Sequence, residues 1–147
     1  MTPNGLWLIA AVLLQGALAL VLLWLLGTIR VPLVQAGRIK TADVALSRDP
    51  WPVRGKQVAN AFDNQFQLPL LFYVAAGLAL FFGPTLLEVV LGWLFVLSRI
   101  IHAAIFVSDN HVIRRFSAYT FGFAVLGVFW IDLVIRLIFV AAHPVGV

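Results

Sequence analysis

The sequence contains no cysteine among its 147 residues and few charged side chains of either sign. Without thiols, the chain forms no disulfide framework and no thiolate metal site, and it offers no protein thiol as a nucleophile. Any sulfur chemistry would therefore depend on a ligand that carries the sulfur. The three histidines have no recognisable ligand spacing, so we do not expect a metal site.

Charge is scarce enough to indicate where the chain resides. Charged residues make up 11% of the sequence, whereas a soluble domain contains roughly a quarter. Hydrophobic residues make up 63%, and the mean hydropathy is +1.04. These values predict an integral membrane protein, and the length predicts a single domain over residues 1–147. The net charge of +4 does not indicate nucleic acid, because the basic residues lie in loops beside apolar segments.

Four apolar stretches are long enough to cross a bilayer, whose core needs about 20 apolar residues of helix. They predict an all-α fold, a bundle of four transmembrane helices. The spans are expected at residues 6–29, 58–82, 84–107 and 116–142. The first stretch lacks the basic segment and short apolar core of a secretory signal peptide, so we expect it to be retained as a helix.

Turn and end signals separate the later spans. Phe82-Gly83-Pro84 predicts a tight turn, with Pro84 in the first turn of the third helix. His143-Pro144 predicts the end of the fourth helix.

The basic residues lie on one side of the predicted bundle. Residues 28–57 contain six basic residues against two acidic ones, and residues 107–115 contain two against one. The two chain termini and the turn between the second and third spans contain no Lys or Arg. The positive-inside rule therefore predicts both basic loops in the cytoplasm and both chain ends outside. Arg136 near the outer end of the fourth span is an exception, and we expect Asp132, one turn before it, to neutralise it.

Polar residues recur at helical spacing within the apolar spans. In the third span, Arg99, His102 and Phe106 share one helix face. Near the start of the second span, an i, i+3, i+4, i+7 pattern contains Asn60, Asp63, Asn64 and Gln67. Polar side chains at membrane depth normally face a bundle interior or a wet cavity, and they are functional by default.

The cytoplasmic half of the bundle is therefore expected to contain a mainly cationic cavity. Arginine supplies forked, permanently charged donors for carboxylates, and Asp63 is placed to receive an ammonium group. The basic residues around the cavity are Arg30, Arg54, Lys56, Arg99, Arg114 and Arg115. This set predicts an anionic guest with more than one carboxylate or phosphate.

Structural roles compete with this interpretation. The polar residues of the second span would also serve as interhelical hydrogen bonds, each contributing less than about 1 kcal/mol. Arg99 would also reach the headgroups by snorkelling, and a lone His102 is more often a buried hydrogen-bonding residue. Arg114 and Arg115 would also serve as topology determinants that bind anionic lipid headgroups.

Two segments, at residues 54–73 and 99–116, resemble the signature of a known family. Their matching residues are Asn60-Ala-Phe-Asp63-Asn64 and Pro69 in the first segment, and Arg99-Ile-Ile-His102, Phe106 and Arg115-Phe116 in the second. With four short spans and a long basic first loop, the chain is similar to the membrane-associated proteins in eicosanoid and glutathione metabolism, the MAPEG family.

The resemblance implies a homotrimer of four-helix subunits, with glutathione held between neighbours near the cytoplasmic face. It implies that Arg115 stabilises the glutathione thiolate, with Arg114 as the alternative if the register shifts by one. Lys56, rather than Arg54, keeps the family's spacing to Asn60. The residues expected to bind glutathione are Arg30, Arg54, Lys56, Asn60, Asp63, Asn64, Gln67, Arg99, His102 and Phe106.

The chain departs from the family's pattern at some of these positions. Asp63 replaces the usual glutamate, which shortens the side chain by one methylene. Phe106 stands where many members have tyrosine, so one hydroxyl donor is missing. Extra residues separate Asp63 from Pro69, and in an alternative register Asn64 and Gln67 form the matching pair.

The activity that the resemblance implies depends on the glutathione thiol. A free thiol has a pKa of about 8.5, and only the thiolate attacks electrophiles. A guanidinium favours the anion without accepting its proton. We therefore expect a glutathione transferase or peroxidase of the bacterial inner membrane, acting on a lipophilic electrophile or hydroperoxide from the membrane lipid. The alternatives are a non-catalytic lipid-binding or accessory subunit and, from Asp63, Arg99 and His102, a small transporter.

Overall fold

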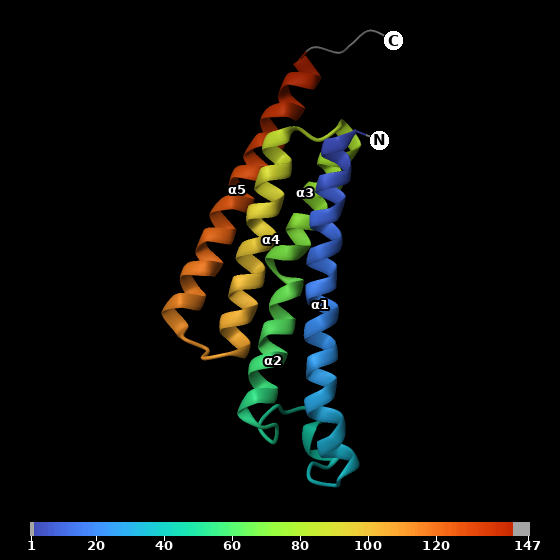
Figure 1. Cartoon of the computed structure of the whole chain (residues 1–147), viewed down its shortest axis with the longest axis vertical. Helices are drawn as coiled ribbons and strands as arrows, with labels where there is room; N and C mark the ends of the chain where they lie inside the picture. The colour runs from blue at the N-terminus through green and yellow to red at the C-terminus, as the bar shows by residue number, and fades with distance from the viewer. Residues whose placement is uncertain (1, 143–147) are drawn as a thin grey trace.

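The computed structural model describes residues 2–142, and every regular element in that range is helical (Figure 1). The elements are α1 (Pro3–Gln35), η1 (Thr41–Val44), α2 (Val53–Asp63), η2 (Asn64–Phe66), α3 (Leu68–Phe82), α4 (Leu86–Val107) and α5 (Val112–Ala142). The stretches long and apolar enough to cross a membrane are Pro3–Gln35, Val53–Phe82, Leu86–Val107 and Val112–Val140. The predicted all-α, four-span membrane fold is therefore confirmed. The end signal at His143-Pro144 lies outside the described residues.

Helix α1 continues beyond the predicted span of residues 6–29, and its C-terminal cap explains where it stops. Gly37 adopts a left-handed φ of +67°. The backbone N–H of Gly37 donates to the carbonyl of Val34, and that of Arg38 donates to Leu33, both at 3.0 Å. This is a Schellman motif, which satisfies the last carbonyls of the helix. At 33 residues, α1 is about 50 Å long, so it extends beyond a hydrocarbon core of about 30 Å.

The second span is broken, not continuous. Pro69 has no N–H, and its ring would clash with the carbonyl of the preceding turn, so α2 cannot run straight into α3. The chain turns at Gln67, whose φ and ψ are −102° and −105°. The Gln65 side chain donates to the carbonyl of Ala61 at 3.0 Å and so caps the end of α2. The predicted polar face over four positions is therefore interrupted before its last member.

Caps also shift the starts of the last two spans. Helix α4 begins at Leu86, because Thr85 is its N-cap and forms a capping box with Glu88. We had predicted Pro84 in the first turn of this helix, but it precedes the helix. Helix α5 begins before the predicted residue 116, so Arg114 and Arg115 belong to its first turn.

Helix α4 forms the centre of the packing and contacts α1, α2, α3 and α5. The rings of Phe72 and Phe95 stack with their centroids 4.8 Å apart, and Leu8 and Phe129 are fully buried beside them. A Cβ at Gly92 would lie 2.9 Å from Leu8 Cδ1, so this glycine permits the close approach of α1 to α4. This core therefore holds together the half of the bundle nearer the chain termini.

The two ends of the molecule differ in character. Figure 1 shows the N-terminus and the C-terminal end of α5 at one end, and the turns after α1 and α4 at the other. Both basic loops therefore share one end, as the sequence predicts. Large apolar side chains such as Leu13, Trp24 and Phe123 are exposed along the outer helices, as expected for surfaces that contact lipid.

A buried ion pair differs from the one predicted. Arg136 pairs with Glu88, Nη1 to Oε1 at 2.5 Å, and also donates to the carbonyls of Phe82 (3.3 Å) and Gly83 (3.1 Å). Glu88 is fully buried. The expected salt bridge from Arg136 to Asp132 is therefore replaced by one to α4. Arg136 thereby joins α5 both to the first turn of α4 and to the turn between α3 and α4.

Candidate functional site

A cavity of about 310 Å³ lies between α4 and α5, near the end of the molecule that carries the basic loops. Its size is at the lower end of the range for small-molecule sites, about 300–1,000 Å³. The residues that line it are Asn64, His102, Phe106, Val112, Arg115, Phe116 and Tyr119. We call it the His102 cavity.

His102 lines this cavity and has one buried ring nitrogen without a partner among the described residues. Its Nδ1 lies 3.0 Å from the backbone carbonyl oxygen of Arg115. A carbonyl oxygen accepts only, so the imidazole donates from Nδ1, and in the neutral ring Nε2 is an acceptor. Nε2 is buried and has no hydrogen-bond partner among the described residues. The tautomer thus leaves Nε2 as a buried, unpaired acceptor beside the cavity.

Arg115 brings positive charge to the same cavity. Its guanidinium carbon lies 4.0 Å from the ring centroid of Phe106, and Nη1 donates to Asn110 Oδ1 at 2.5 Å. Because Arg115 lies in the first turn of α5, the positive end of the helix dipole adds to its charge. An anion in the His102 cavity would therefore be stabilised by two sources.

Arg114, the alternative to Arg115 in the sequence, points elsewhere. It forms a salt bridge with Asp109 at 3.3 Å, and its side chain is 69% exposed. It does not line the His102 cavity. Of the two consecutive arginines, the structure brings only Arg115 to His102.

Arg99 lies deep beside the cavity and is fully buried. Its guanidinium carbon is 5.4 Å from the ring centroid of Tyr119, itself a lining residue. Nε, Nη1 and Nη2 have no hydrogen-bond partner among the described residues. A buried, unpaired cation is costly, so an anionic group beside Arg99 would relieve a large desolvation penalty. Its complete burial also argues against snorkelling to the headgroups.

Asn60 and Asp63 belong to a second polar cluster, on the side of α2 that faces the long loop. Arg48 from that loop pairs with Asp63 at 2.6 Å, and it donates to Asn60 Oδ1 at 3.4 Å. Arg30 at the end of α1 lies over the ring of Trp51, with 4.6 Å between its guanidinium carbon and the ring centroid. Local spacing did not indicate Arg48, because its partners lie 12 and 15 residues further along the chain.

The two clusters meet only through Asn64. This residue lines the His102 cavity, and its amide nitrogen donates to the carbonyl of Asn60 at 2.8 Å. Within a single copy of the described chain, Asn60 and Asp63 themselves do not line that cavity. The predicted site is thus split into a His102 cavity and an Arg48–Asp63 cluster.

Three other predicted residues lie apart from the His102 cavity. Arg54 donates to the backbone carbonyl of Val107 and so joins the start of α2 to the end of α4. Lys56 is half-buried on α2. Gln67 is exposed at the break between η2 and α3, which turns it away from the face that carries Asn60.

Sequence reasoning missed a buried polar pair and one lining aromatic. Gln15 in α1 donates from Nε2 to Gln65 Oε1 at 2.8 Å, and both residues are buried. Gln15 interrupts an otherwise apolar run, which was the available signal. Tyr119 was recognisable only by its position one turn after Arg115.

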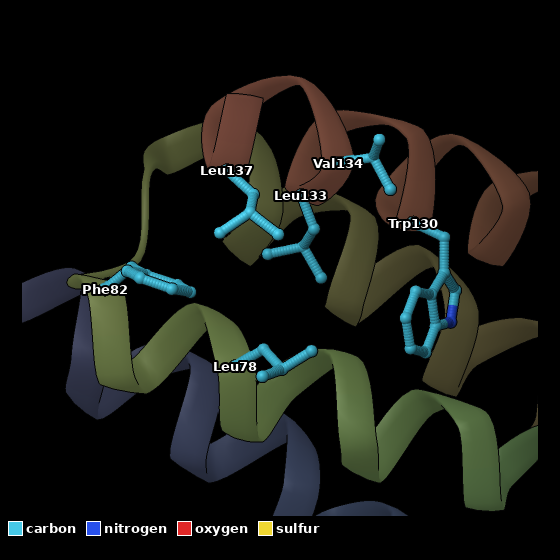
Figure 2. Close-up of a pocket in the computed structure, with 6 residues that line it drawn as sticks. All are labelled: Leu78, Phe82, Trp130, Leu133, Val134 and Leu137. Carbon is cyan, nitrogen blue, oxygen red and sulfur yellow. The ribbon is translucent and has the colours of Figure 1, made fainter. Parts of the chain in front are cut away.

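A further cavity lies between α3 and α5 towards the opposite end of the molecule, and Figure 2 shows its walls. Its volume is about 220 Å³. It is lined by Leu78, Phe82, Trp130, Leu133, Val134 and Leu137. Among the described residues none of those that line it is charged, so it offers contacts to an apolar group.

The fold and the site together define a class of protein. It is an integral membrane protein with four spanning helices and an anion-attracting cavity that contains arginine and histidine near one end. The model of the MAPEG family matches residues 8–135, most of the chain, and the protein belongs to this family. The family includes glutathione transferases and related proteins. No curated protein and no solved structure matches the chain.

Proposed function

We propose that the protein is a membrane-bound glutathione transferase or peroxidase that holds glutathione as its thiolate. The observation that carries the proposal is the convergence of Arg115 and His102 on one cavity, beside the buried and unpaired Arg99. Family membership supports glutathione as the thiol. The expected lipophilic partner would come from the surrounding membrane lipid.

The chemical role of Arg115 is electrostatic. Each unit by which a thiol pKa falls corresponds to about 1.4 kcal/mol of preference for the thiolate. A guanidinium beside the sulfur, together with the positive end of α5, supplies such a preference and cannot take up the proton itself. The proton released from the thiol passes to water at the loop end of the bundle.

Two reactions begin from this thiolate. In conjugation, the sulfur donates an electron pair to an electrophilic carbon, and the leaving group departs with the electrons of the broken bond. With a lipid hydroperoxide, the sulfur attacks the terminal peroxide oxygen, the O–O bond breaks, and the alkoxide takes a proton to leave as an alcohol. A second glutathione then converts the sulfenic acid into the disulfide and water.

Binding of the tripeptide would use the remaining polar residues. Arg99 would pair with a carboxylate, and Asp63 would receive the ammonium group. Because Asp63 does not line the His102 cavity of its own copy, the proposal includes the homotrimer implied by the family resemblance, in which a neighbour completes the site. The basic loops would lie in the cytoplasm of a bacterial cell, with the helices in its inner membrane.

A non-catalytic role for the same fold is favoured by one observation. Asp63 is neutralised by Arg48 at 2.6 Å, so a ligand ammonium would have to displace that arginine. Phe106 also lacks the hydroxyl of the tyrosine that many family members have at this position. In this alternative the cavity would bind a lipid, or the protein would be an accessory subunit of a larger membrane complex, and no thiol would be activated.

The test is a titration of glutathione with detergent-solubilised protein, monitored by calorimetry for binding and by ultraviolet difference absorbance for the thiolate. We expect wild type to give both signals. Arg115→Gln should keep binding but lose the thiolate signal, because it removes only the cation beside the sulfur. Arg38→Gln, which removes an exposed arginine in the loop after α1, is the matched control and should behave as wild type.

Each outcome bears on one alternative. Binding without thiolate absorbance in wild type would support the non-catalytic role and reject the enzyme. A full thiolate signal in Arg115→Gln that disappears in Arg114→Gln would show that the other register of the fourth span is correct. No binding at all would reject glutathione as the ligand.

A further inference from the structure

The side of the α4–α5 pair that faces away from the His102 cavity carries a second, larger groove. Its volume is about 540 Å³. It is lined by Leu94, Leu97, Ser98, Ile101, Ile105, Ile113, Arg114, Ser117, Ala118 and Phe121. We call it the Arg114 groove. Neither the family match nor the proposed glutathione chemistry assigns it a ligand.

The groove exists because α4 and α5 touch at one level and separate below it. At the contact, a Cβ on Gly122 would lie 2.4 Å from Ser98 Oγ, so the helices are as close as glycine allows. Towards the turn that joins them the ribbons draw apart, as Figure 1 shows. The gap between the two helices opens on two sides, towards the His102 cavity and towards the Arg114 groove. Arg114 and Arg115 are about 100° apart around α5, so each arginine faces one side.

The chemistry of the groove changes along its length. Its walls are aliphatic and aromatic, and the hydroxyl of Ser98 is already bonded to the carbonyl of Phe95 at 2.6 Å. Its one charged lining residue is Arg114, at the loop end and in the first turn of α5. The groove thus presents an apolar channel that ends in a cation.

The length and position of the groove match one leaflet of a bilayer. From Leu94 to Ile105 along α4 the distance is about 16 Å, and the hydrocarbon core is about 30 Å thick. Arg114 therefore lies at the polar boundary when the apolar walls lie within one leaflet. Exposed lining residues such as Leu97 and Ile113 leave the groove open towards lipid.

We propose that the Arg114 groove is a binding site for an anionic phospholipid. The guanidinium of Arg114 binds the phosphodiester, and one acyl chain lies along the walls formed by α4 and α5. The acyl chain gains little from leaving other lipid tails, so the headgroup charge determines selectivity. One basic residue near a membrane surface is equivalent to about fivefold in lipid affinity.

The local charges favour an anionic over a zwitterionic headgroup. Arg114, Arg115 and the positive end of α5 stand against Asp109 alone at this corner of the molecule. Because Arg114 is paired with Asp109 through one nitrogen at 3.3 Å, its other N–H groups stay available to a phosphate. This site is on the opposite side of α5 from the proposed glutathione site and does not depend on it.

The test uses phosphatidylglycerol with a photoreactive diazirine in one acyl chain, added to the full-length protein in nanodiscs. After irradiation, labelled peptides are mapped by mass spectrometry. We expect adducts concentrated at residues 97–105 and 113–121. Arg114→Gln should lower this labelling about fivefold. Arg38→Gln, a control for total charge in the other loop, should not.

Further arms separate the sources of the label. Ala118→Phe, which fills the groove, should lower the labelling without removing Arg114; if this variant does not fold, Arg114→Gln still decides, because that arginine is exposed. Equal labelling by diazirine phosphatidylethanolamine or by a diazirine fatty acid would overturn the proposal. So would adducts spread evenly onto the exposed face of α1, or an unlabelled groove covered by another copy of the chain.

Discussion

Adding a methyl group at Gly122 should disrupt the contact that fixes the α4–α5 crossing. The new Cβ would lie 2.4 Å from Ser98 Oγ and 3.4 Å from its Cβ. The hydroxyl would have to rotate away and lose its 2.6 Å bond to the carbonyl of Phe95, or the helices would have to move apart. Overpacking of this kind costs about 1–3 kcal/mol.

The gain in helix propensity from Gly to Ala, about 1 kcal/mol, partly masks this cost, so a matched variant is needed. Gly127 lies on the same helix, and a Cβ there would meet nothing within 4 Å. We therefore expect the free energy of unfolding of Gly122→Ala to be about 1–3 kcal/mol below that of Gly127→Ala. Denaturant titration in mixed micelles, followed by circular dichroism, measures the difference.

The same contact predicts a rescue. Ser98→Ala removes the clashing oxygen, and the carbonyl of Phe95 keeps its bond within the helix, so this change alone should cost little. The double variant Ser98→Ala/Gly122→Ala should recover most of the lost stability, giving a coupling free energy of about 1–2 kcal/mol. If Gly122→Ala is as stable as Gly127→Ala, or if Ser98→Ala gives no recovery, the close contact does not exist in the protein.

Three other predictions concern buried or competing polar pairs. Glu88→Gln keeps the capping box but leaves Arg136 without its carboxylate, so it should lower the free energy of unfolding by up to about 3 kcal/mol. Glu88→Asp keeps the charge and should lower the free energy of unfolding less. Equal losses in the two variants would contradict the role of charge. Arg48→Gln frees Asp63 and should strengthen glutathione binding, as measured by calorimetry. Because the Arg48–Asp63 pair is about half exposed, the gain in affinity should be less than about fivefold. Adding Asp63→Asn should abolish this gain. Gln15→Leu leaves the side-chain oxygen of its buried glutamine partner unpaired and should cost about 1 kcal/mol in the same unfolding assay, with an unchanged value counting against that hydrogen bond.

The number of spans could be predicted because it depends on apolar length alone. Where each helix begins and ends depends on caps, which involve a few specific atoms. Thr85 with Glu88 and the left-handed Gly37 set two of these ends, and both are visible in the sequence once the geometry is known. Local signals of this kind are weaker than a run of about 20 apolar residues. The predicted helix boundaries therefore differ from those of the structure, whereas the predicted fold class agrees with it.

The candidate site was predictable where a helix is uninterrupted. Arg99, His102 and Phe106 share a face of α4 because that helix runs regularly through them. The polar pattern of the second span failed at Gln67, because Pro69 breaks the helix before the repeat is complete. The assignment of the predicted site residues to glutathione stays a prediction.

The partners of the charged residues could not be read from periodicity. Arg48 reaches Asp63 from a loop, and Arg136 reaches Glu88 from another helix. Such contacts depend on how the elements pack, and a single sequence does not encode them as a spacing. Helix periodicity separates Arg114 from Arg115 by about 100°, but which of them faces the His102 cavity depends on how α4 and α5 pack.

Because of the break between α2 and α3, the two halves of this membrane span pack in different hydrophobic clusters. Phe72 and Ala75 on α3 belong to the main aromatic core, whereas Ala61 on α2 packs in a separate small cluster with Leu22 and Phe106. A shift of α2 therefore leaves the stacked rings in place. Substitutions in the α3 half of this span can therefore change the stability of the aromatic core without changing the α2 half, which lies towards the basic loops.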